Sequence, residues 1–335
     1  MTMKTTSLGK AGPLVSAIGL GCMGMSPGVY GPSDDAESLA TIVAAVDAGI
    51  TLIDTGDFYG MGHNEMLIRR ALETVPRSKV VISVKFGALR DPVGGFGGND
   101  CRPQAVKNFL AYTLRRLGTD YIDIYRPARL DPDTPIEDTI GAIADMVRAG
   151  YVRHIGLSEV GAATIRRAHK VHPISDLQIE YSLMSRGVET AILPTTHELG
   201  IAVTAYGVLS RGLLSGRVPG AGTKGDIRVV RMPRFEQGNL EKNLSLVETL
   251  RQIGRDKGAT AAQLAVAWVL SRGPDIVPVV GARRRDQLKE TLGALDIKLD
   301  AQDLARIEAA VSPDLTAGAR YDAGQMAHLD SEAHG

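Results

Sequence analysis

The sequence predicts an α/β fold of the (β/α)8, or TIM-barrel, type, with an N-terminal β-hairpin cap and extended loops on the C-terminal face. Short apolar runs rich in Val and Ile alternate with longer amphipathic stretches along nearly all of the 335 residues. Eight such units fit into roughly 280 residues, the usual size of a closed barrel. No Pro/Ser-rich linker or change in composition divides the chain, so we expect a single domain spanning residues 1–335.

The predicted strands are continuous apolar runs, which are typical of a parallel sheet covered on both faces. They are Ala17–Gly21, Thr51–Asp54, Val80–Lys85, Ile122–Tyr125, Val152–Leu157, Leu177–Glu180, Ala202–Tyr206 and Ile276–Val280. The predicted helices include Ala36–Ala48, Asn64–Glu73, Pro103–Leu117, Pro135–Arg148, Ala162–Lys170 and Glu189–Leu199. Ser33 is a start signal for the first helix, and Gly49 and Gly118 are stop signals. An open, doubly wound sheet is the alternative with the same alternation.

Three segments depart from the repeat. Lys4–Val15 contains the turn signal Gly9-Lys-Ala-Gly-Pro13 and predicts a small hairpin at the bottom of the barrel. Gly207–Met232 is rich in Gly, Arg and Pro, which predicts a long loop on the C-terminal face, where binding loops of barrels lie. The tail, residues 313–335, is small and polar, which is compatible either with disorder or with folding over the site.

Composition narrows the class of function. Lys+Arg and Asp+Glu both total 38, so no basic excess favours nucleic acid or anionic lipid as a partner. The chain carries neither the apolar segment of a signal peptide nor an apolar run long enough to span a membrane. The two cysteines, Cys22 and Cys101, form no disulfide framework, and Cys22 is interpreted as a small residue filling a gap. We therefore expect a cytoplasmic protein that acts on small molecules.

Gly19-Leu-Gly21-Cys-Met-Gly24 matches the dinucleotide fingerprint of the open α/β fold. In that fold the glycines lead directly into a helix, whose N-terminal amides hold the pyrophosphate. Here Met25-Ser-Pro-Gly-Val-Tyr-Gly-Pro-Ser33 follows, and its prolines and glycines predict a loop. We therefore interpret the match as accidental.

The residues with a catalytic pattern are Asp54, Tyr59 and Lys85, which lie at or just after the ends of the second and third predicted strands. In a barrel both strand ends reach the catalytic face. A buried lysine there needs a carboxylate, and Asp54 is the natural partner. Reduction of a carbonyl by hydride requires a proton for the oxygen, and a lysine cation would lower the pKa of a tyrosine enough to make it a donor. Spacing alone leaves an internal salt bridge beside a merely packed Tyr59 as an equal alternative.

The segment Asp54-Thr-Gly-Asp-Phe-Tyr59-Gly-x-Gly-x-Asn64-Glu65 resembles the signature of the aldo-keto reductase family. The resemblance covers nearly the whole chain. It includes Arg115-Arg-Leu-Gly-Thr-Asp-Tyr-Ile-Asp123, Val152-Arg-His-Ile-Gly-Leu-Ser158-Glu159, Leu177-Gln178-Ile-Glu-Tyr181-Ser and Ala205-Tyr206-Gly-Val-Leu-Ser-Arg-Gly-Leu-Leu-Ser-Gly216. It implies an NADPH-dependent carbonyl reductase with a catalytic Asp, Tyr and Lys at Asp54, Tyr59 and Lys85.

The resemblance also implies where the cofactor binds. Ser158 and Gln178 correspond to the residues that hold the nicotinamide carboxamide, and Tyr206 to the aromatic ring that stacks on the nicotinamide. Arg283 and Arg284, at the start of a predicted helix after the last strand, correspond to the site of the 2′-phosphate and favour NADPH over NADH. Further implied contacts are Gly21, Met23, Asp54, Gly207, Leu209, Arg211, Gly281, Gln287 and Glu290. The family often has Asn at the position of Glu159, so a cofactor contact there does not carry over.

The chain departs from the family at one catalytic position. The family's His, five residues after the strand-four Asp, is here Ala128, counted from Asp123. The same His is absent from pyridoxal reductases of the family, which makes an aromatic or pyridoxal-like aldehyde the expected substrate. His63, Phe86 and Arg126 are candidate substrate contacts, Arg126 if its side chain points to the mouth. No His and carboxylate cluster has metal-ligand spacing.

Three functions remain open at this point. A carbonyl reductase is favoured by Asp54, Tyr59 and Lys85 together. A regulatory protein that binds NADPH and acts through a partner is favoured by the lost His. A dehydrogenase on an open α/β fold would require Gly24 to begin a helix. The sequence indicates neither the physiological substrate nor the oligomeric state.

Overall fold

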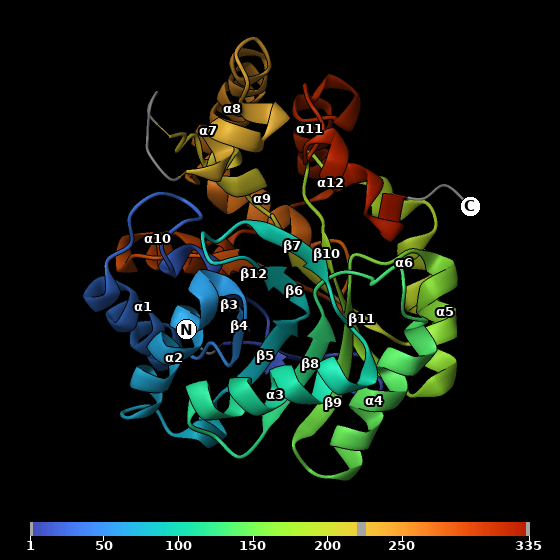
Figure 1. Ribbon diagram of the computed structural model, residues 1–335. Helices are drawn as coiled ribbons and strands as arrows, with labels where there is room; N and C mark the ends of the chain where they lie inside the picture. Colours follow the sequence, from blue (N-terminus) through green and yellow to red (C-terminus); the bar gives the residue numbers. More distant parts are fainter. Residues whose placement is uncertain (1–2, 220–225, 333–335) are drawn as a thin grey trace.

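The computed structural model describes residues 3–219 and 226–332, and its centre is a closed barrel of parallel strands (Figure 1). The barrel strands are β3 (Gly19–Gly21), β4 (Leu52–Gly56), β5 (Val81–Phe86), β8 (Ile122–Pro127), β9 (Val152–Ser158), β10 (Ile174–Glu180), β11 (Ala202–Tyr206) and β12 (Ile276–Gly281). They pair in chain order, and β12 closes the ring on β3 through the register partners Val279 and Gly19. The predicted (β/α)8 barrel is therefore confirmed, and the open sheet is excluded.

The strands are apolar because both of their faces are covered. Every residue of β4 and β10 is buried, including the polar ones, so the side chains that point into the barrel and those that point to the helices are equally shielded. The bottom is closed by the predicted hairpin of β1 (Thr5–Ser7) and β2 (Leu14–Ser16). Leu8 and Val15 of this hairpin are fully buried in a cluster with residues of β4, β8, β11 and β12. The hairpin therefore covers the bottom of the barrel, and the opposite end is the one where active sites of this fold lie.

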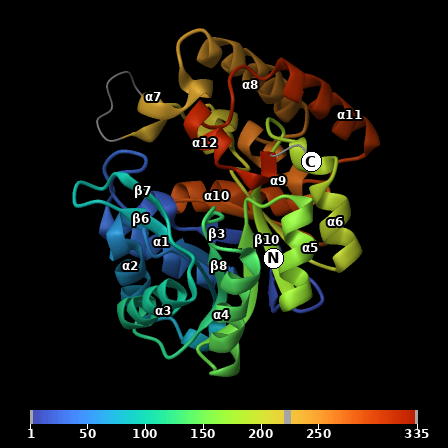
Figure 2. The same ribbon diagram turned by 45° about the vertical axis from the view of Figure 1, so that its right-hand side comes forward.

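The helices surround the barrel as the sequence predicts (Figures 1 and 2). They are α1 (Asp35–Asp47), α2 (His63–Leu72), α3 (Pro103–Leu117), α4 (Ile136–Arg148), α5 (Ala162–Val171), α6 (Ile192–Leu199), α9 (Ala261–Leu270) and α10 (Arg285–Leu292). The first helix is capped by Asp34, whose carboxylate accepts from Glu37 N at 3.0 Å, and not by the predicted Ser33. Within the described ranges, no helix is both long and apolar enough to cross a membrane.

The glycine motif does not open a helix. Gly19–Gly21 forms β3, a single 3-10 turn follows at Met23–Met25, and α1 begins only at Asp35. Gly24 lies inside that short turn, so no helix N-terminus faces the position that a pyrophosphate takes in an open α/β fold. The interpretation of the motif as accidental is confirmed.

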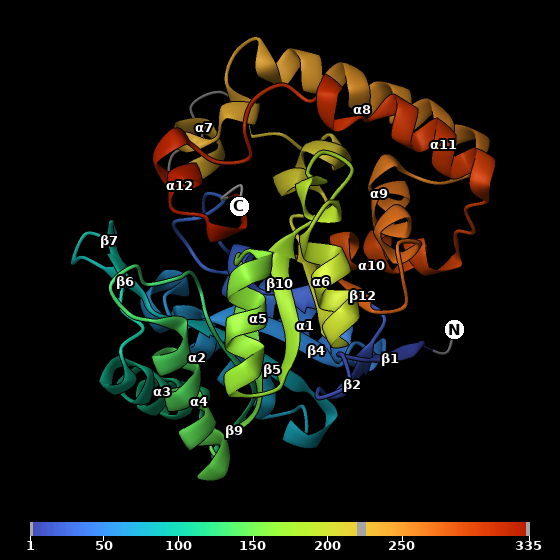
Figure 3. The ribbon, with the colours of Figure 1, turned by 90° about the vertical axis from the view of Figure 1, so that its right-hand side faces the viewer.

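Long connections gather over the carboxyl ends of the strands (Figure 3). The segment 88–101 folds into a hairpin of β6 (Ala88–Arg90) and β7 (Phe96–Asn99), which the sequence did not predict. The predicted loop 207–232 contains a 3-10 segment at Ser210–Ser215 and the short α7 (Ile227–Arg231), and its residues 220–225 lie outside the described ranges. Above it run α8 (Asn239–Asp256) and α11 (Ala301–Ala310), and the tail adds α12 (Ala323–Ala327) on the same side.

The described part of the tail packs onto the molecule. Arg320 and Leu329 are buried, with 7% and 4% of their surfaces exposed. The Asp330 carboxylate accepts a 2.7 Å hydrogen bond from Gly161 N, at the start of α5. Of the two possibilities that its composition allows, the structure has the tail folded over the barrel mouth up to residue 332; residues 333–335 lie outside the described ranges.

Candidate active site

A buried ion pair lies at the carboxyl ends of β4 and β5. Lys85 Nζ is 2.5 Å from Asp54 Oδ2, and the two side chains are 5% and 7% exposed. Lys85 also donates to Gln178 Oε1 at 2.8 Å. Ser83 Oγ and Gln178 Nε2 both donate to Asp54 Oδ1, at 3.0 and 2.8 Å. The predicted pairing of Lys85 with Asp54 is confirmed, and Gln178 from β10 joins it.

Tyr59 lies directly beside this pair. It begins a 3-10 turn after β4, it is 8% exposed, and Lys85 Nζ is 5.3 Å from the centre of its ring. Burial raises the pKa of Tyr59 well above its usual value, and the charge of Asp54 raises it further. The expectation of a lowered pKa for Tyr59 is therefore wrong for the structure as it stands, because burial dominates. The hydroxyl is fully protonated at neutral pH, as a proton donor must be.

Asn64 anchors the loop that carries Tyr59. Asn64 accepts from Thr55 Oγ1 at 2.7 Å and donates to Cys22 O at 2.9 Å and to Ser26 Oγ at 2.8 Å. His63 is occupied on both ring nitrogens, by Ser26 Oγ at 3.0 Å and by Asp35 at 3.2 Å. These bonds give His63 a role in holding the loop and leave it no free ring nitrogen for a substrate.

The prediction that Phe86 and Arg126 contact the substrate is wrong. Phe86 is fully buried and stacks on Tyr125 with ring centres 4.2 Å apart, towards α3. Arg126 is also fully buried and pairs with Asp176 of β10 at 2.9 Å. Its side chain points into the barrel interior below the mouth, where Asp176 compensates its charge. Both residues are therefore inaccessible to a substrate.

Ala128 occupies the place of the missing histidine at the end of β8. It is 2% exposed, and its N–H donates to Phe86 O at 2.8 Å. The next residue, Arg129, is half-buried and reaches over this backbone. Its Nη1 donates to Ala128 O at 2.6 Å and its Nη2 to the Tyr321 hydroxyl at 3.4 Å. Arg129 and Tyr321 were not predicted as site residues, and no local sequence pattern distinguishes them.

Glu159, at the barrel mouth, is buried and has several hydrogen-bond partners. It follows β9 in the left-handed conformation, with φ 54°, and it is 1% exposed. Its carboxylate accepts from Arg320 at 2.6 and 3.0 Å, from Ser331 at 2.7 Å and from the Tyr206 hydroxyl at 2.7 Å. Burial alone would raise its pKa, but the charge of Arg320 lowers it to about 2. The tail thus supplies the cation that this position requires.

Several predicted cofactor residues are arranged to receive a ligand. Among the residues that the structure describes, the buried Ser158 hydroxyl has no hydrogen-bond partner. Such an orphan needs a partner, and a carboxamide would supply it. Tyr206 lies at the end of β11, and its hydroxyl is 2.8 Å from that of Tyr321. Gln178, by contrast, is bound to Asp54 and Lys85, so it can hold a carboxamide only by giving up one of those bonds.

The loop after Tyr206 turns sharply. Gly207 and Arg211 have φ of 66° and 56°, and Leu209 lies between them with its side chain partly buried against the core. Arg211 pairs with Glu180 at 2.9 Å and its side chain is 7% exposed. In this structure Arg211 therefore holds the loop onto the end of β10.

The predicted phosphate end lies where β3 and β12 meet. Gly21 and Gly281 are register partners, and Met23 follows in the next turn. Arg283 donates to Tyr30 O at 2.9 Å and to Pro32 O at 3.2 Å, and Gln287 Oε1 accepts from Arg283 N at 3.1 Å. Burial, and then repulsion by Arg228, lowers the pKa of Arg283. An anion at this end would relieve that repulsion, so these residues fit a phosphate.

Two neighbours of Arg283 already have partners. Arg284 lies 2.9 Å from Asp286, and both side chains are more than half exposed. Glu290 pairs with Arg217 at 2.8 Å. Exposed ion pairs of this kind are weak, so Arg284 can leave Asp286 and bind a phosphate with little loss of free energy.

Enzymes with a (β/α)8 barrel have their active sites at the carboxyl ends of the strands, and this is where the buried Asp54–Lys85 pair and Tyr59 lie. The sequence model of the Aldo/keto reductase family matches residues 17–312. Probable aldo-keto reductase 1 of Glycine max is 39% identical over 325 residues, which cover 95% of this chain and 92% of that protein. The chain belongs to the aldo-keto reductase family.

Solved structures agree with this assignment. A glycerol dehydrogenase from Gluconobacter oxydans superposes with a TM-score of 0.82 at 29% identity, covering 93% of this chain and 97% of the other. The holo form of an aldo-keto reductase from Bacillus halodurans superposes with a TM-score of 0.77 at 27% identity, with the same shares covered. Reduction of carbonyl compounds with a nicotinamide cofactor is the general activity of the family.

Proposed function

We propose that this enzyme reduces an aldehyde or ketone to the alcohol with NADPH, and that Tyr59 is the proton donor. The observation that supports it is the buried network of Lys85, Asp54 and Gln178 beside a protonated Tyr59. The reduced nicotinamide, when bound, supplies the hydride that adds to the carbonyl carbon. The Tyr59 hydroxyl gives its proton to the carbonyl oxygen, and the resulting phenolate lies next to the Lys85 cation.

The network favours the charged form of Lys85. Burial lowers the pKa of Lys85, and the charge of Asp54 acts against this. If Lys85 became neutral, the phenolate that forms on Tyr59 would lose the nearest cation of the network, and proton transfer would become unfavourable. Asp54 is therefore proposed to hold Lys85 in place and charged.

NADPH is the proposed cofactor. Its nicotinamide carboxamide would meet the unpaired Ser158 hydroxyl, its ring would lie against Tyr206, and its 2′-phosphate would bind Arg283 and Arg284. The proposed substrate is an aromatic or pyridoxal-like aldehyde, because Ala128 replaces the family's histidine, as in pyridoxal reductases of the family. The proposed location is the cytoplasm, whose reducing conditions suit two free, buried cysteines.

The test is Tyr59→Phe, which removes only the hydroxyl. We expect reduction of a panel of aldehydes, pyridoxal included, to fall by about 10²- to 10⁴-fold, the usual contribution of a general acid. The affinity for NADPH should be unchanged; it is measured from the quenching of protein fluorescence when the cofactor binds. Retained turnover would remove Tyr59 as the donor. If the unaltered protein binds NADPH but reduces nothing in the panel, a regulatory cofactor-binding protein becomes the better explanation.

A further inference from the structure

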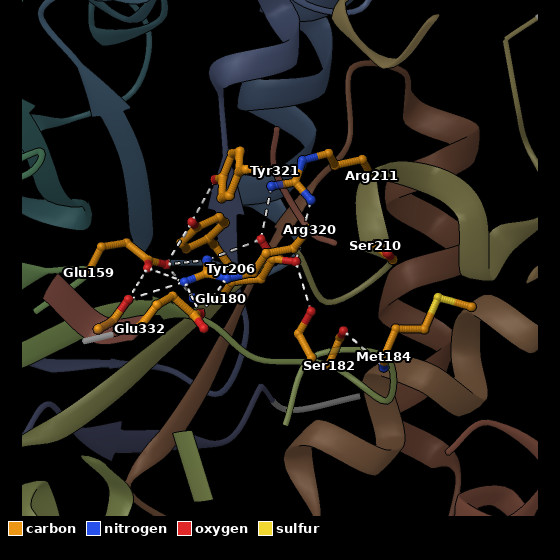
Figure 4. Close-up of polar contacts among 12 residues, drawn as sticks. Glu159, Glu180, Ser182, Met184, Tyr206, Ser210, Arg211, Arg320, Tyr321 and Glu332 are labelled. Carbon is orange, nitrogen blue, oxygen red and sulfur yellow. Dashed lines mark hydrogen bonds and ion pairs between the residues drawn. The ribbon is translucent and has the colours of Figure 1, made fainter. Parts of the chain in front are cut away.

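Among the described residues around the tail at the barrel mouth, Arg129 is a guanidinium group that is not paired with a carboxylate. Arg320 pairs with Glu159, Glu180 and Glu332, and Arg211 also pairs with Glu180 (Figure 4). Arg234 lies 3.7 Å from Glu180 as well. These three carboxylates therefore already serve three guanidinium groups. Arg129 adds a fourth.

Arg129 itself has only neutral partners in the described part of the chain. They are the carbonyl of Ala128, the hydroxyl of Tyr321 at 3.4 Å, and the Tyr321 ring, whose centre is 6.0 Å from the guanidinium carbon. Glu159 is the carboxylate whose charge acts on Arg129, but its oxygens already accept from Arg320, Ser331 and the Tyr206 hydroxyl. The charge of Glu159 thus acts on Arg129 without a direct ion pair between them. A half-buried guanidinium group that contacts no carboxylate keeps free N–H donors for an anion.

The position of Arg129 places this anion beside the reaction centre. The residue follows the end of β8, next to β5, which carries Lys85. Arg129 donates to the carbonyl of Ala128, whose own N–H bonds to Phe86 O, directly after Lys85. The Tyr321 hydroxyl that accepts from Arg129 lies 2.8 Å from the Tyr206 hydroxyl, and the charge of Arg129 opposes the rise in the pKa of Tyr59. The proposed phosphate site of the cofactor is elsewhere, at β12 and Arg283. An anion at Arg129 therefore belongs to the substrate.

We propose that Arg129 is a substrate-recognition residue and that the enzyme reduces carbonyl compounds that carry a negatively charged group, such as a carboxylate. This rests on the proposed reductase function and adds the substrate class to it. The planar guanidinium can bind a carboxylate with two parallel hydrogen bonds, and only two of its five N–H groups are used in the structure. Tyr321 holds the group in place from the tail, so the tail takes part in substrate recognition.

The test compares 4-carboxybenzaldehyde with its neutral methyl ester. Arg129→Gln should lower kcat/KM for the acid by about 10- to 100-fold, mainly by raising KM. The kcat/KM for the ester should change by less than about twofold. Arg129→Lys keeps the positive charge but loses the planar pair of N–H donors, so we expect an intermediate loss of kcat/KM for the acid. Arg231→Gln is the matched control, since Arg231 is an exposed arginine on the same side of the molecule. It should leave the preference for the acid unchanged.

Other outcomes overturn the inference. Equal losses on the acid and the ester would make Arg129 a group that stabilises the carbonyl oxygen in place of the missing histidine. Unchanged kinetics would remove Arg129 from the site altogether.

A binding measurement separates this inference from the proposed function. Calorimetry with 4-(hydroxymethyl)benzoate and its methyl ester, on the protein saturated with NADPH, needs no turnover. If neither aldehyde is reduced but the benzoate binds at least tenfold more weakly to Arg129→Gln, the reductase proposal fails and the anion site stands. If the variant and the parent bind the benzoate equally, the anion site fails.

Discussion

Removing the cation of Arg320 should undock the tail. Arg320 is separated from its partner Glu159 by 161 positions in the chain, and both side chains are buried, 7% and 0% exposed. In Arg320→Gln the Glu159 carboxylate would stay in the mouth without its counter-charge. Since residues 313–332 are held on the barrel mouth by contacts such as those of Arg320, Leu329 and Asp330, we expect the loss to appear as local release of this segment before global unfolding.

The pKa of Glu159 gives the size of the effect. It is lowered from 4.5 to about 2, which corresponds to about 3 kcal/mol in favour of the docked, ionised state. Because this pKa is lower in the folded protein, the stabilisation is present above about pH 4.5 and is lost as the pH falls towards 2. Loss of one partner of a buried pair costs a similar amount, about 3–5 kcal/mol. Exchange of the tail amides should therefore become about 100-fold faster at pH 7.

Hydrogen exchange followed by mass spectrometry measures this directly on peptides from residues 313–332. Glu332→Gln is the matched control, because its carboxylate also pairs with Arg320 but its side chain is 38% exposed, so the effect should stay below about 1 kcal/mol. The double variant Glu159→Gln with Arg320→Gln should recover most of the protection. The reasoning is refuted if Arg320→Gln leaves tail exchange unchanged, or if the double variant is no better protected than Arg320→Gln alone.

Two further predictions concern the phosphate end and a buried carboxyl group. Replacing Arg283 and Arg284 together by Ala should weaken NADPH binding at least tenfold more than NADH binding in a fluorescence titration, and equal losses would contradict the 2′-phosphate assignment. Burial, and then the charge of Glu65, raises the pKa of Asp57 from 3.8 to about 8. A raised pKa means that the parent loses stability as the pH rises from about 4 to about 8. Asp57→Asn should therefore gain stability relative to the parent over that range, by up to a few kcal/mol in urea unfolding, and a constant difference between pH 5 and pH 8 would contradict it.

The barrel could be predicted because its information is local. Each strand is a short apolar run and each helix an amphipathic one, so the periodicity of a few residues is enough to identify them. The helix Pro103–Leu117 has the predicted bounds, with Gly118 ending it at φ 66°. Hairpin β6–β7 was missed because it is exposed and rich in glycine, and so lacks the apolar alternation that marks a buried strand.

Side-chain direction was harder to predict than position. Arg126 directly follows the predicted strand Ile122–Tyr125 and lies on the observed β8. Its direction depends on Asp176, which belongs to another strand and pairs with it inside the barrel. The accessible cation at the mouth is Arg129, three positions further on, beyond the end of the strand. A one-residue change of register moves a side chain to the other face, so composition alone could not decide between these arginines.

The sequence by itself determined the barrel and the meeting of Asp54, Tyr59 and Lys85, because the carboxyl ends of parallel strands must gather at one end of a closed sheet. Only the tertiary structure decided what surrounds them. Glu159 meets Arg320 of the tail, and Arg129 meets Tyr321, across 161 and 192 positions of chain. Such contacts form because a buried charge requires a partner. The neighbouring residues in the sequence do not indicate which distant residue that partner is.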